Sequence, residues 1–345
     1  MTKTIGVSWI AFLAAILTIT ACGGERTALI NGAGATFPYP LYSKWFSEYA
    51  KVNTNVNFNY QSIGSGGGIR QIISGTVDFG ATDGPMTDEQ LAQAPGELLH
   101  LPTVLGGDVA VYNVPGVTGS INLSQDALAG IFLGTVKTWN DPAIVSVNEG
   151  VALPANPIVV VHRSDGSGTT FIWTDFLSKV SDSWAQQVGK GTSVNWPVGL
   201  GGKGNEGVAG LVKQTPYSIG YVELGYAENQ KLTHAKIENA AGEYVLCTQE
   251  TVTKAAAAAA ANMPADFRVS ITNPQGPGVY PIASFTWLLV YTEQKDAQKG
   301  QALTGFLKWM LHEGQQYAGP LGYAPLPPEV VTLEEAAIGK IRVAS

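Results

Sequence analysis

The amino-acid sequence predicts an α/β protein with two domains, and three observations carry this prediction. The chain has 345 residues, more than one typical hydrophobic core accommodates. Short apolar runs of strand type alternate with segments whose apolar residues recur at helical spacing, as in folds with a largely parallel sheet flanked by helices. The early strands each run into a polar, glycine-containing loop, and ligands of such sheets bind where strands end.

The N-terminal residues 1–21 have the pattern of a secretory signal peptide. Lys3 gives a basic start, residues 5–19 are mostly apolar, and a small residue precedes Cys22. This ending resembles the bacterial lipobox, in which the cysteine becomes the lipidated N-terminus after cleavage. We therefore expect an exported protein, held in the periplasm or at the outer cell surface by lipid on Cys22, with residues 22–26 as a tether. An ordinary signal peptide with an incidental cysteine is the alternative.

Charge and reactive residues argue against several classes of protein. The chain has a formal net charge of −7, and removal of residues 1–21 takes away one lysine and no acidic residue. An acidic chain argues against nucleic-acid binding, but not against a small anion held by short-range hydrogen bonds. If Cys22 carries lipid, Cys247 has no disulfide partner and is expected to be a partly buried apolar residue. The four histidines lack metal-ligand spacing, so we expect neither a metal site nor a cofactor.

The first part of the chain alternates between strands and helices. The expected order is strand 29–30, helix 40–50, strand 56–60, a short helix through 69–73 and strand 77–81. Three polar loops follow the strands, at 32–37, 63–68 and 82–84. Because these loops lie at the carboxyl ends of strands, we expect them to contribute to one ligand site.

The most informative stretch is residues 163–170, between an apolar strand at 158–161 and a helix over 171–180. A strand that runs through a Gly/Ser/Thr turn into a helix directs backbone N–H groups and the positive end of the helix dipole at one spot. Arg163 adds a permanent positive charge, and Asp165 is placed to hold its guanidinium. The stretch is typical of a site that holds a tetraoxyanion without reacting with it.

Later segments indicate how the two domains connect. Two Pro/Gly-rich stretches, 101–107 and 273–281, mark possible crossings. Residues 303–311 have helical apolar spacing and are expected to pack on the first domain. The alanine run 255–261 is expected to form an exposed or lightly packed helix. The glycines of 199–204 lack the Ser or Thr that a P-loop needs after its lysine, and indicate a tight turn between domains or at the surface.

Five motifs occur in one order and spacing, and together they span nearly all of the chain after the signal peptide. They are residues 32–38, 63–68, 77–83, 163–169 and 196–205. With these motifs the chain resembles the phosphate-binding subunits of bacterial phosphate-specific ABC transporters. The resemblance implies a two-lobed, hinged periplasmic-binding-protein fold, each lobe a mostly parallel sheet flanked by helices. It assigns residues 27–104 and 282–345 to lobe 1 and residues 105–281 to lobe 2.

The resemblance also implies the ligand, the residues that bind it and the partners. Inorganic phosphate would be held by Thr36, Phe37, Ser65, Asp83, Arg163, Ser167, Gly168 and Thr169. Asp165 would hold the Arg163 guanidinium, and no ligand group departs from the family pattern, although His162 precedes Arg163 and Gly66 replaces a common serine. The loaded protein would deliver phosphate to membrane permease and ATPase subunits that this chain does not encode. No catalysis is expected of the protein itself.

Asp83 decides which anion this site would take. A carboxylate beside an anion is unfavourable unless the ligand donates a proton to it, which phosphate can do and sulfate at neutral pH cannot. On spacing alone, Asp83 is equally well placed to be a helix N-cap, and Arg163 to form a surface ion pair with Asp165. Simple helix caps at Ser167 and Thr169 are compatible with anion binding at the same helix end. Three rival functions stay open: a secreted phosphatase, a receptor for sulfate or molybdate, and a sensor or surface adhesin that binds phosphate but feeds no transporter.

Overall fold

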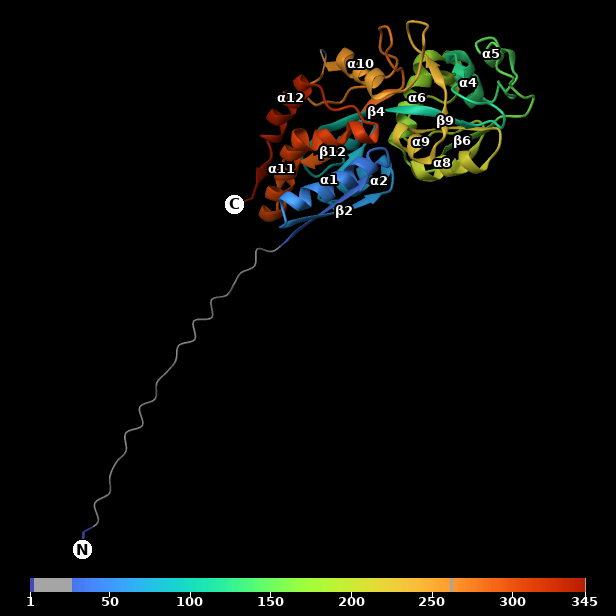
Figure 1. Ribbon diagram of the computed structural model, residues 1–345. Helices are drawn as coiled ribbons and strands as arrows, with labels where there is room; N and C mark the ends of the chain where they lie inside the picture. The colour runs from blue at the N-terminus through green and yellow to red at the C-terminus, as the bar shows by residue number, and fades with distance from the viewer. Residues whose placement is uncertain (3–26, 261–262, 345) are drawn as a thin grey trace.

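The computed structural model describes residues 1–2, 27–260 and 263–344. Cys22, the tether 22–26 and nearly all of the predicted signal peptide lie outside these residues. Figure 1 shows two lobes side by side, with the blue N-terminal and red C-terminal segments in one and the green and yellow segments in the other. Within the described ranges, no helix combines the length and apolar character needed to cross a membrane.

One nine-stranded sheet runs through both lobes, in the order β2-β1-β3-β12-β4-β8-β6-β7, with β9 paired to β4. We call the part built on β1, β2, β3 and β12 lobe 1, and the part built on β6, β7 and β8 lobe 2. The strands of this sheet span Ala28–Gly34 (β1), Val56–Ser62 (β2), Phe79–Thr82 (β3), Leu98–Asn113 (β4), Val159–Arg163 (β6), Leu200–Gly202 (β7), Ser218–Glu223 (β8), Thr233–His234 (β9) and Ala283–Tyr291 (β12).

The sheet is mixed as a whole, but in each lobe most strands run in one direction, as the sequence predicts. β1 pairs in parallel with β2 and β3, and β6 pairs in parallel with β7 and β8. β12 runs antiparallel to both of its neighbours, and β4 runs antiparallel to β8. The antiparallel pairs of this sheet all involve β12 or β4, so its mixed character comes from these two strands.

Strand β4 passes from one lobe to the other without interruption. Its residues 98–107 pair with β12, and its residues 108–113 pair with β8. The first crossing therefore lies inside a strand, just beyond the Pro/Gly-rich stretch 101–107. The return crossing, residues 273–281, ends where β12 begins. The lobe boundaries at 104/105 and 281/282 stay a prediction.

Short strands and helices complete the two lobes. The minor strands, in two small sheets, span Asn122–Leu123 (β5), Lys236–Glu238 (β10), Tyr244–Val245 (β11), Glu293–Gln294 (β13) and Arg342–Val343 (β14). The α-helices span Tyr39–Val52 (α1), Ser65–Ile73 (α2), Asp88–Leu91 (α3), Gln125–Leu133 (α4), Pro142–Val145 (α5), Gly168–Val180 (α6), Asp182–Gln187 (α7), Gly204–Gln214 (α8), Leu224–Gln230 (α9), Gln249–Ala260 (α10), Ala297–Leu311 (α11) and Pro328–Ile338 (α12). Two 3₁₀ helices span Glu313–Tyr317 (η1) and Gly319–Leu321 (η2).

Two helix predictions need correction. Residues 65–68, expected in a turn, form the start of α2. A Cβ on Gly68 would lie 2.6 Å from the Cα of Gly34, so glycine lets this helix pack directly on β1. Residues 255–260 of the alanine run lie in α10, which packs against β4 and β12, and Ala255 and Ala256 are fully buried rather than lightly packed.

Each lobe has an aromatic core against its part of the sheet. In lobe 1 the Phe58 ring lies 4.6 Å from the rings of both Phe46 and Phe306. Phe306 belongs to α11, so this helix packs on lobe 1, as the sequence predicts for residues 303–311. In lobe 2 the Trp173 ring stacks on Tyr221 at 4.9 Å. Such ring pairs stabilise each lobe beyond the burial of apolar area alone.

Candidate functional site

Asp83 follows β3 directly and is buried in the contact between the lobes. Its Oδ1 accepts a hydrogen bond of 2.8 Å from the hydroxyl of Thr286 on β12, and its Oδ2 lies 3.3 Å from the hydroxyl of Ser65. Burial raises the pKa of Asp83 to about 7, although the Thr286 hydroxyl and the charge of Arg163 act in the opposite direction. Asp83 is thus a fixed acceptor whose ionisation lies close to neutral pH.

Ser65, the first residue of α2, joins the two lobes. Its Oγ accepts N–H hydrogen bonds from Asp83 at 3.1 Å and from Gly168 of lobe 2 at 3.0 Å. Next to it, the N–H of Gly66 donates to the carbonyl of Gly166 at 3.0 Å. The glycine-rich start of α2 therefore touches the turn before α6 without an intervening side chain.

Arg163 ends β6 and carries the positive charge of the site. Its Nε and Nη2 donate to Oδ1 and Oδ2 of Asp165 at 2.9 and 2.6 Å, and Asp165 Oδ1 also accepts from the N–H of Gly204 at 3.0 Å. Burial opposes charge on Arg163, but Asp165 outweighs it and raises the pKa of the guanidinium. Burial likewise opposes charge on Asp165, yet Arg163 lowers its pKa. Both groups stay ionised, and the remaining Nη1 donates to Thr169 at 3.1 Å.

The N-terminus of α6 is capped by Ser167, which is also one of the predicted site residues. Ser167 Oγ accepts the N–H of Thr170 at 3.0 Å, so Ser167 is a helix cap as well as a site residue. Its own N–H donates to Thr192 at 2.8 Å. The helix has 13 residues, so its N-terminus carries a full dipole that favours negative charge.

Thr36 and Phe37 lie in the loop between β1 and α1. The Thr36 Oγ1 accepts from the side-chain amide of Asn205, in α8 of lobe 2, at 2.7 Å. Both backbone carbonyls are fixed by tyrosines, Thr36 by Tyr226 at 2.6 Å and Phe37 by Tyr323 at 2.7 Å. This loop is therefore anchored from both lobes.

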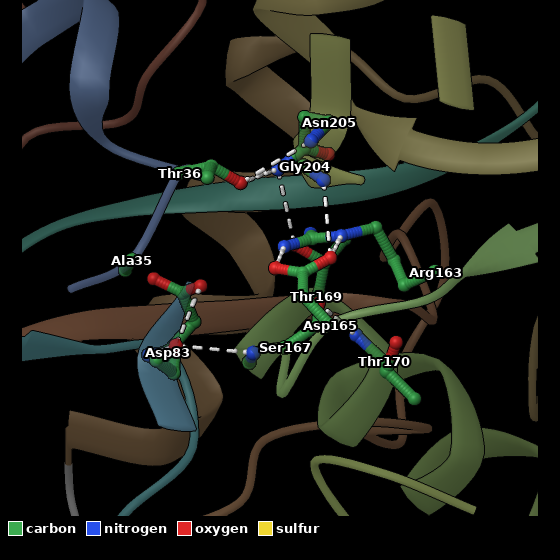
Figure 2. A network of polar contacts seen from close by, with 12 residues as sticks. Ala35, Thr36, Asp83, Arg163, Asp165, Ser167, Thr169, Thr170, Gly204 and Asn205 are labelled. Carbon is green, nitrogen blue, oxygen red and sulfur yellow. Dashed lines mark hydrogen bonds and ion pairs between the residues drawn. The ribbon is translucent and has the colours of Figure 1, made fainter. Parts of the chain in front are cut away.

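All the residues predicted for the phosphate site come together, and all are buried except Asp165, which is half-buried. Figure 2 shows side chains from four separate segments that point toward one another, with Thr36 and Asp83 facing Arg163, Asp165 and Asn205. His162 is not among them, because its ring stacks on Trp196 at 4.8 Å. Among the residues that the structure describes, no acidic, histidine or cysteine side chains form a group suited to a metal ion.

Two members of this network are missed by the sequence analysis. Thr286 lies in a buried strand far from Asp83 in sequence, and nothing local marks it. Asn205 lies within one of the five motifs, in the first turn of α8, and helix N-termini are positions where anions often bind. The tight turn expected at 199–204 is wrong in part, because Leu200–Gly202 form strand β7, which pairs with β6. Asn205, which follows this stretch, does contact the other lobe, through Thr36.

Comparison with known proteins identifies the family of the chain. A family model described as a PBP superfamily domain matches residues 23–313. The phosphate-binding protein PstS of Pasteurella multocida is 48% identical over 322 residues, which cover 93% of this chain and 93% of that relative. The chain belongs to the PstS family. A second PstS relative, from Xylella fastidiosa, is 47% identical and covers 90% of this chain and 85% of its own length.

Solved structures confirm the fold class. A phosphate-binding protein from Stenotrophomonas maltophilia superposes with a TM-score of 0.67, covering 90% of this chain and 93% of that one at 21% identity. At 21% sequence identity, this structural similarity supports the fold and not the function. It supports the two-lobed α/β architecture that the PstS motifs imply.

Proposed function

We propose that this protein binds inorganic phosphate between its lobes and delivers it to an ABC transporter for import. Its relatives of more than 45% identity are named phosphate-binding proteins. The observation that carries the proposal is the position of Asp83, a buried acceptor of lobe 1 set against N–H, hydroxyl and guanidinium donors. A ligand for this arrangement presents oxygen atoms on most sides and one hydrogen toward Asp83. Monohydrogen and dihydrogen phosphate both do so.

The proposed ligand groups are those expected from the sequence. Thr36, Phe37 and Ser65 contribute from lobe 1, together with Asp83 as acceptor. Arg163 and the N-terminus of α6, with Ser167, Gly168 and Thr169, contribute from lobe 2, and Asp165 positions the guanidinium. The hydroxyls of Ser65 and Ser167 contact backbone N–H groups rather than a histidine base, which favours binding over catalysis.

The proposed mechanism is hinge closure. Phosphate docks on one lobe and the other lobe closes over it, bending the chain at the two crossings. The direct contacts of Ser65 with Gly168 and of Gly66 with Gly166 correspond to the closed form. Small-angle X-ray scattering of phosphate-free protein should show compaction when phosphate is added. An unchanged radius of gyration would contradict closure.

The first test is calorimetric titration of phosphate-stripped protein at pH 8. We expect tight one-to-one binding of phosphate and no heat from sulfate. Tight sulfate binding would assign the site to a different anion receptor. No phosphate binding by folded protein would remove the proposed ligand.

We also propose export and anchoring by lipid on Cys22, with permease and ATPase subunits as partners. The pattern of residues 1–22 supports the anchor, and the first strand begins shortly after it, at Ala28. Cys22→Ser should release the protein from the membrane fraction while leaving phosphate binding intact. Equal membrane association of the two forms would exclude the lipid anchor. Loss of phosphate uptake in cells lacking this protein would separate a transport role from a sensor.

A further inference from the structure

Asn205 is fully buried in the first turn of α8 and makes contacts in both lobes. Its Oδ1 accepts the N–H of Glu223 at 2.9 Å, which fixes the orientation of the amide. The Nδ2 then donates to two hydroxyl oxygens, Thr36 Oγ1 at 2.7 Å and Thr169 Oγ1 at 3.2 Å. The backbone N–H of Asn205 also donates to Thr36 Oγ1, at 3.3 Å. One residue therefore connects both hydroxyls to the strand β8.

These contacts leave the hydroxyls of Thr36 and Thr169 able only to donate a hydrogen bond to a ligand. A hydroxyl oxygen has two acceptor positions and one hydrogen. Thr36 Oγ1 accepts twice from Asn205, and Thr169 Oγ1 accepts from Asn205 and from Arg163. With both acceptor positions occupied, each hydroxyl is left with its hydrogen to donate.

The arrangement depends on the contact between the lobes. Thr36 belongs to lobe 1, whereas Asn205 and Thr169 belong to lobe 2. When the lobes separate, Thr36 loses both of its N–H donors, and its hydroxyl is free to accept as well as donate. Closure around a ligand restores the bonds and directs the hydroxyl hydrogen inward.

We propose that Asn205 is a positioning residue that makes the Thr36 and Thr169 hydroxyls obligate donors to the bound anion when the lobes close. This inference rests on the proposed binding of phosphate and adds a residue that touches the donors rather than the ligand. It also explains selectivity, because a site whose hydroxyls can only donate accepts a ligand hydrogen at Asp83 and nowhere else.

The sharpest variant is Asn205→Asp, which keeps the shape and replaces a donor by an acceptor. The new carboxylate draws the hydroxyl hydrogens of Thr36 and Thr169 toward itself, so the phosphate Kd at pH 8 should rise roughly 100-fold or more. Asn229→Asp adds the same charge at an exposed position of α9 and should leave the Kd within about twofold. The ratio of the Asn205→Asp Kd to the wild-type Kd should fall as the pH is lowered, because a protonated carboxyl can donate again.

A double-mutant cycle with Thr36→Val provides a readout that a structural role would not move. If Asn205 acts through Thr36, Asn205→Asp should cost much less affinity in the Thr36→Val background than in the wild type. Additive losses with no pH dependence of the ratio would overturn the inference. If Asn205→Asp does not fold, Asn205→Ala enters the same cycle, and failure of both to fold would assign Asn205 to the fold instead. Failure of the wild-type protein to bind phosphate would contradict the proposed function itself. An Asn205→Asp variant with the wild-type phosphate Kd would contradict only the role inferred for Asn205.

Discussion

Gly168 of lobe 2 stands against Asp83 of lobe 1 so closely that a Cβ on Gly168 would lie 2.5 Å from the Asp83 Cβ. The same atom would lie 2.5 Å from the hydroxyl oxygen of Ser65. The glycine is required for this approach and not for its backbone conformation, since its φ lies outside the left-handed region. The lobes meet at the site without space for one methyl group.

Gly168→Ala should therefore prevent full closure. We expect the phosphate Kd to rise by about 100-fold or more, because the two halves of the site no longer reach the ligand together. Calorimetry would measure the affinity, and scattering should show no compaction at saturating phosphate. Gly210→Ala in α8 is the matched control, since a Cβ there meets nothing within 4 Å. Wild-type affinity in Gly168→Ala would mean that the closed contact is not needed for binding.

Sulfate should report the protonation of Asp83. Sulfate itself does not titrate near neutral pH, and a protonated Asp83 can donate to it where the carboxylate repels it. With the pKa of Asp83 raised to about 7, sulfate affinity should rise as the pH falls toward 7 and level off below it. Above the pKa the change should be about tenfold per pH unit. Calorimetry from pH 6 to pH 8.5 measures the sulfate affinity, and Asp83→Asn should make this affinity independent of pH. A wild-type sulfate affinity that does not change with pH would contradict the role of Asp83 in distinguishing sulfate from phosphate.

Asp165→Asn should loosen the Arg163 guanidinium. The variant keeps an acceptor oxygen but loses the charge that pairs with Nε and Nη2. Removal of this charge-assisted pair should weaken phosphate binding by about tenfold. Asp266→Asn makes the same change in an exposed pair with Arg268, and should alter the affinity by less than about twofold. Equal effects of the two variants on the Kd would show that the Arg163 pair has no special role.

Asp108 should make the fold less stable as the pH rises. It lies opposite Glu223 where β4 pairs with β8, and neither carboxylate oxygen has a hydrogen-bond partner among the described residues. Burial, with the charges of Asp83 and Glu223, raises the pKa of Asp108 well above its ordinary value. The folded state therefore binds this proton more tightly than the unfolded state, and the stabilisation is present at low pH and lost as the pH rises toward the folded-state pKa.

Asp108→Asn removes this titration. The free energy of unfolding of the variant, relative to the wild type, should increase between pH 4 and pH 8. Urea unfolding of phosphate-free protein at the two pH values measures the difference, and the comparison at pH 4 accounts for the fixed cost of burying an amide. A difference that stays constant would mean that Asp108 is ionised in the fold or paired with a group that titrates with it.

The loops of the site could be predicted because each has a local signature. The turn before α6, with Arg163 and Asp165, belongs to a strand–turn–helix pattern that a few consecutive residues predict. The start of α2 could not be placed, since glycines at 66–68 favour a turn on propensity alone. What puts them in a helix is the close packing of Gly68 on Gly34, a contact between distant parts of the chain.

The antiparallel orientation of β12 and the roles of Thr286 and Asn205 could not be predicted either, because they too depend on contacts between distant parts of the chain. The orientation of β12 depends on where the chain returns from lobe 2, which no periodicity records. The sequence around Thr286 predicts only a buried strand. The pairing of β12 with β3 is what brings the Thr286 hydroxyl to Asp83. Asn205 is near enough to a motif to be noticed, but its role depends on Thr36 in the other lobe.

The place of β12 also determines the order in which the protein can be completed. β12 lies between β3 and β4, although both are made long before it. Lobe 2 forms from one nearly unbroken stretch, whereas lobe 1 keeps two open sheet edges until Ala283–Tyr291 emerge. Because Thr286 is part of that late strand, the shorter of the two hydroxyl contacts of the Asp83 carboxylate forms only after this strand has been made. A chain that ends before Ala283 therefore lacks both the middle of its lobe 1 sheet and one of the groups that orient Asp83.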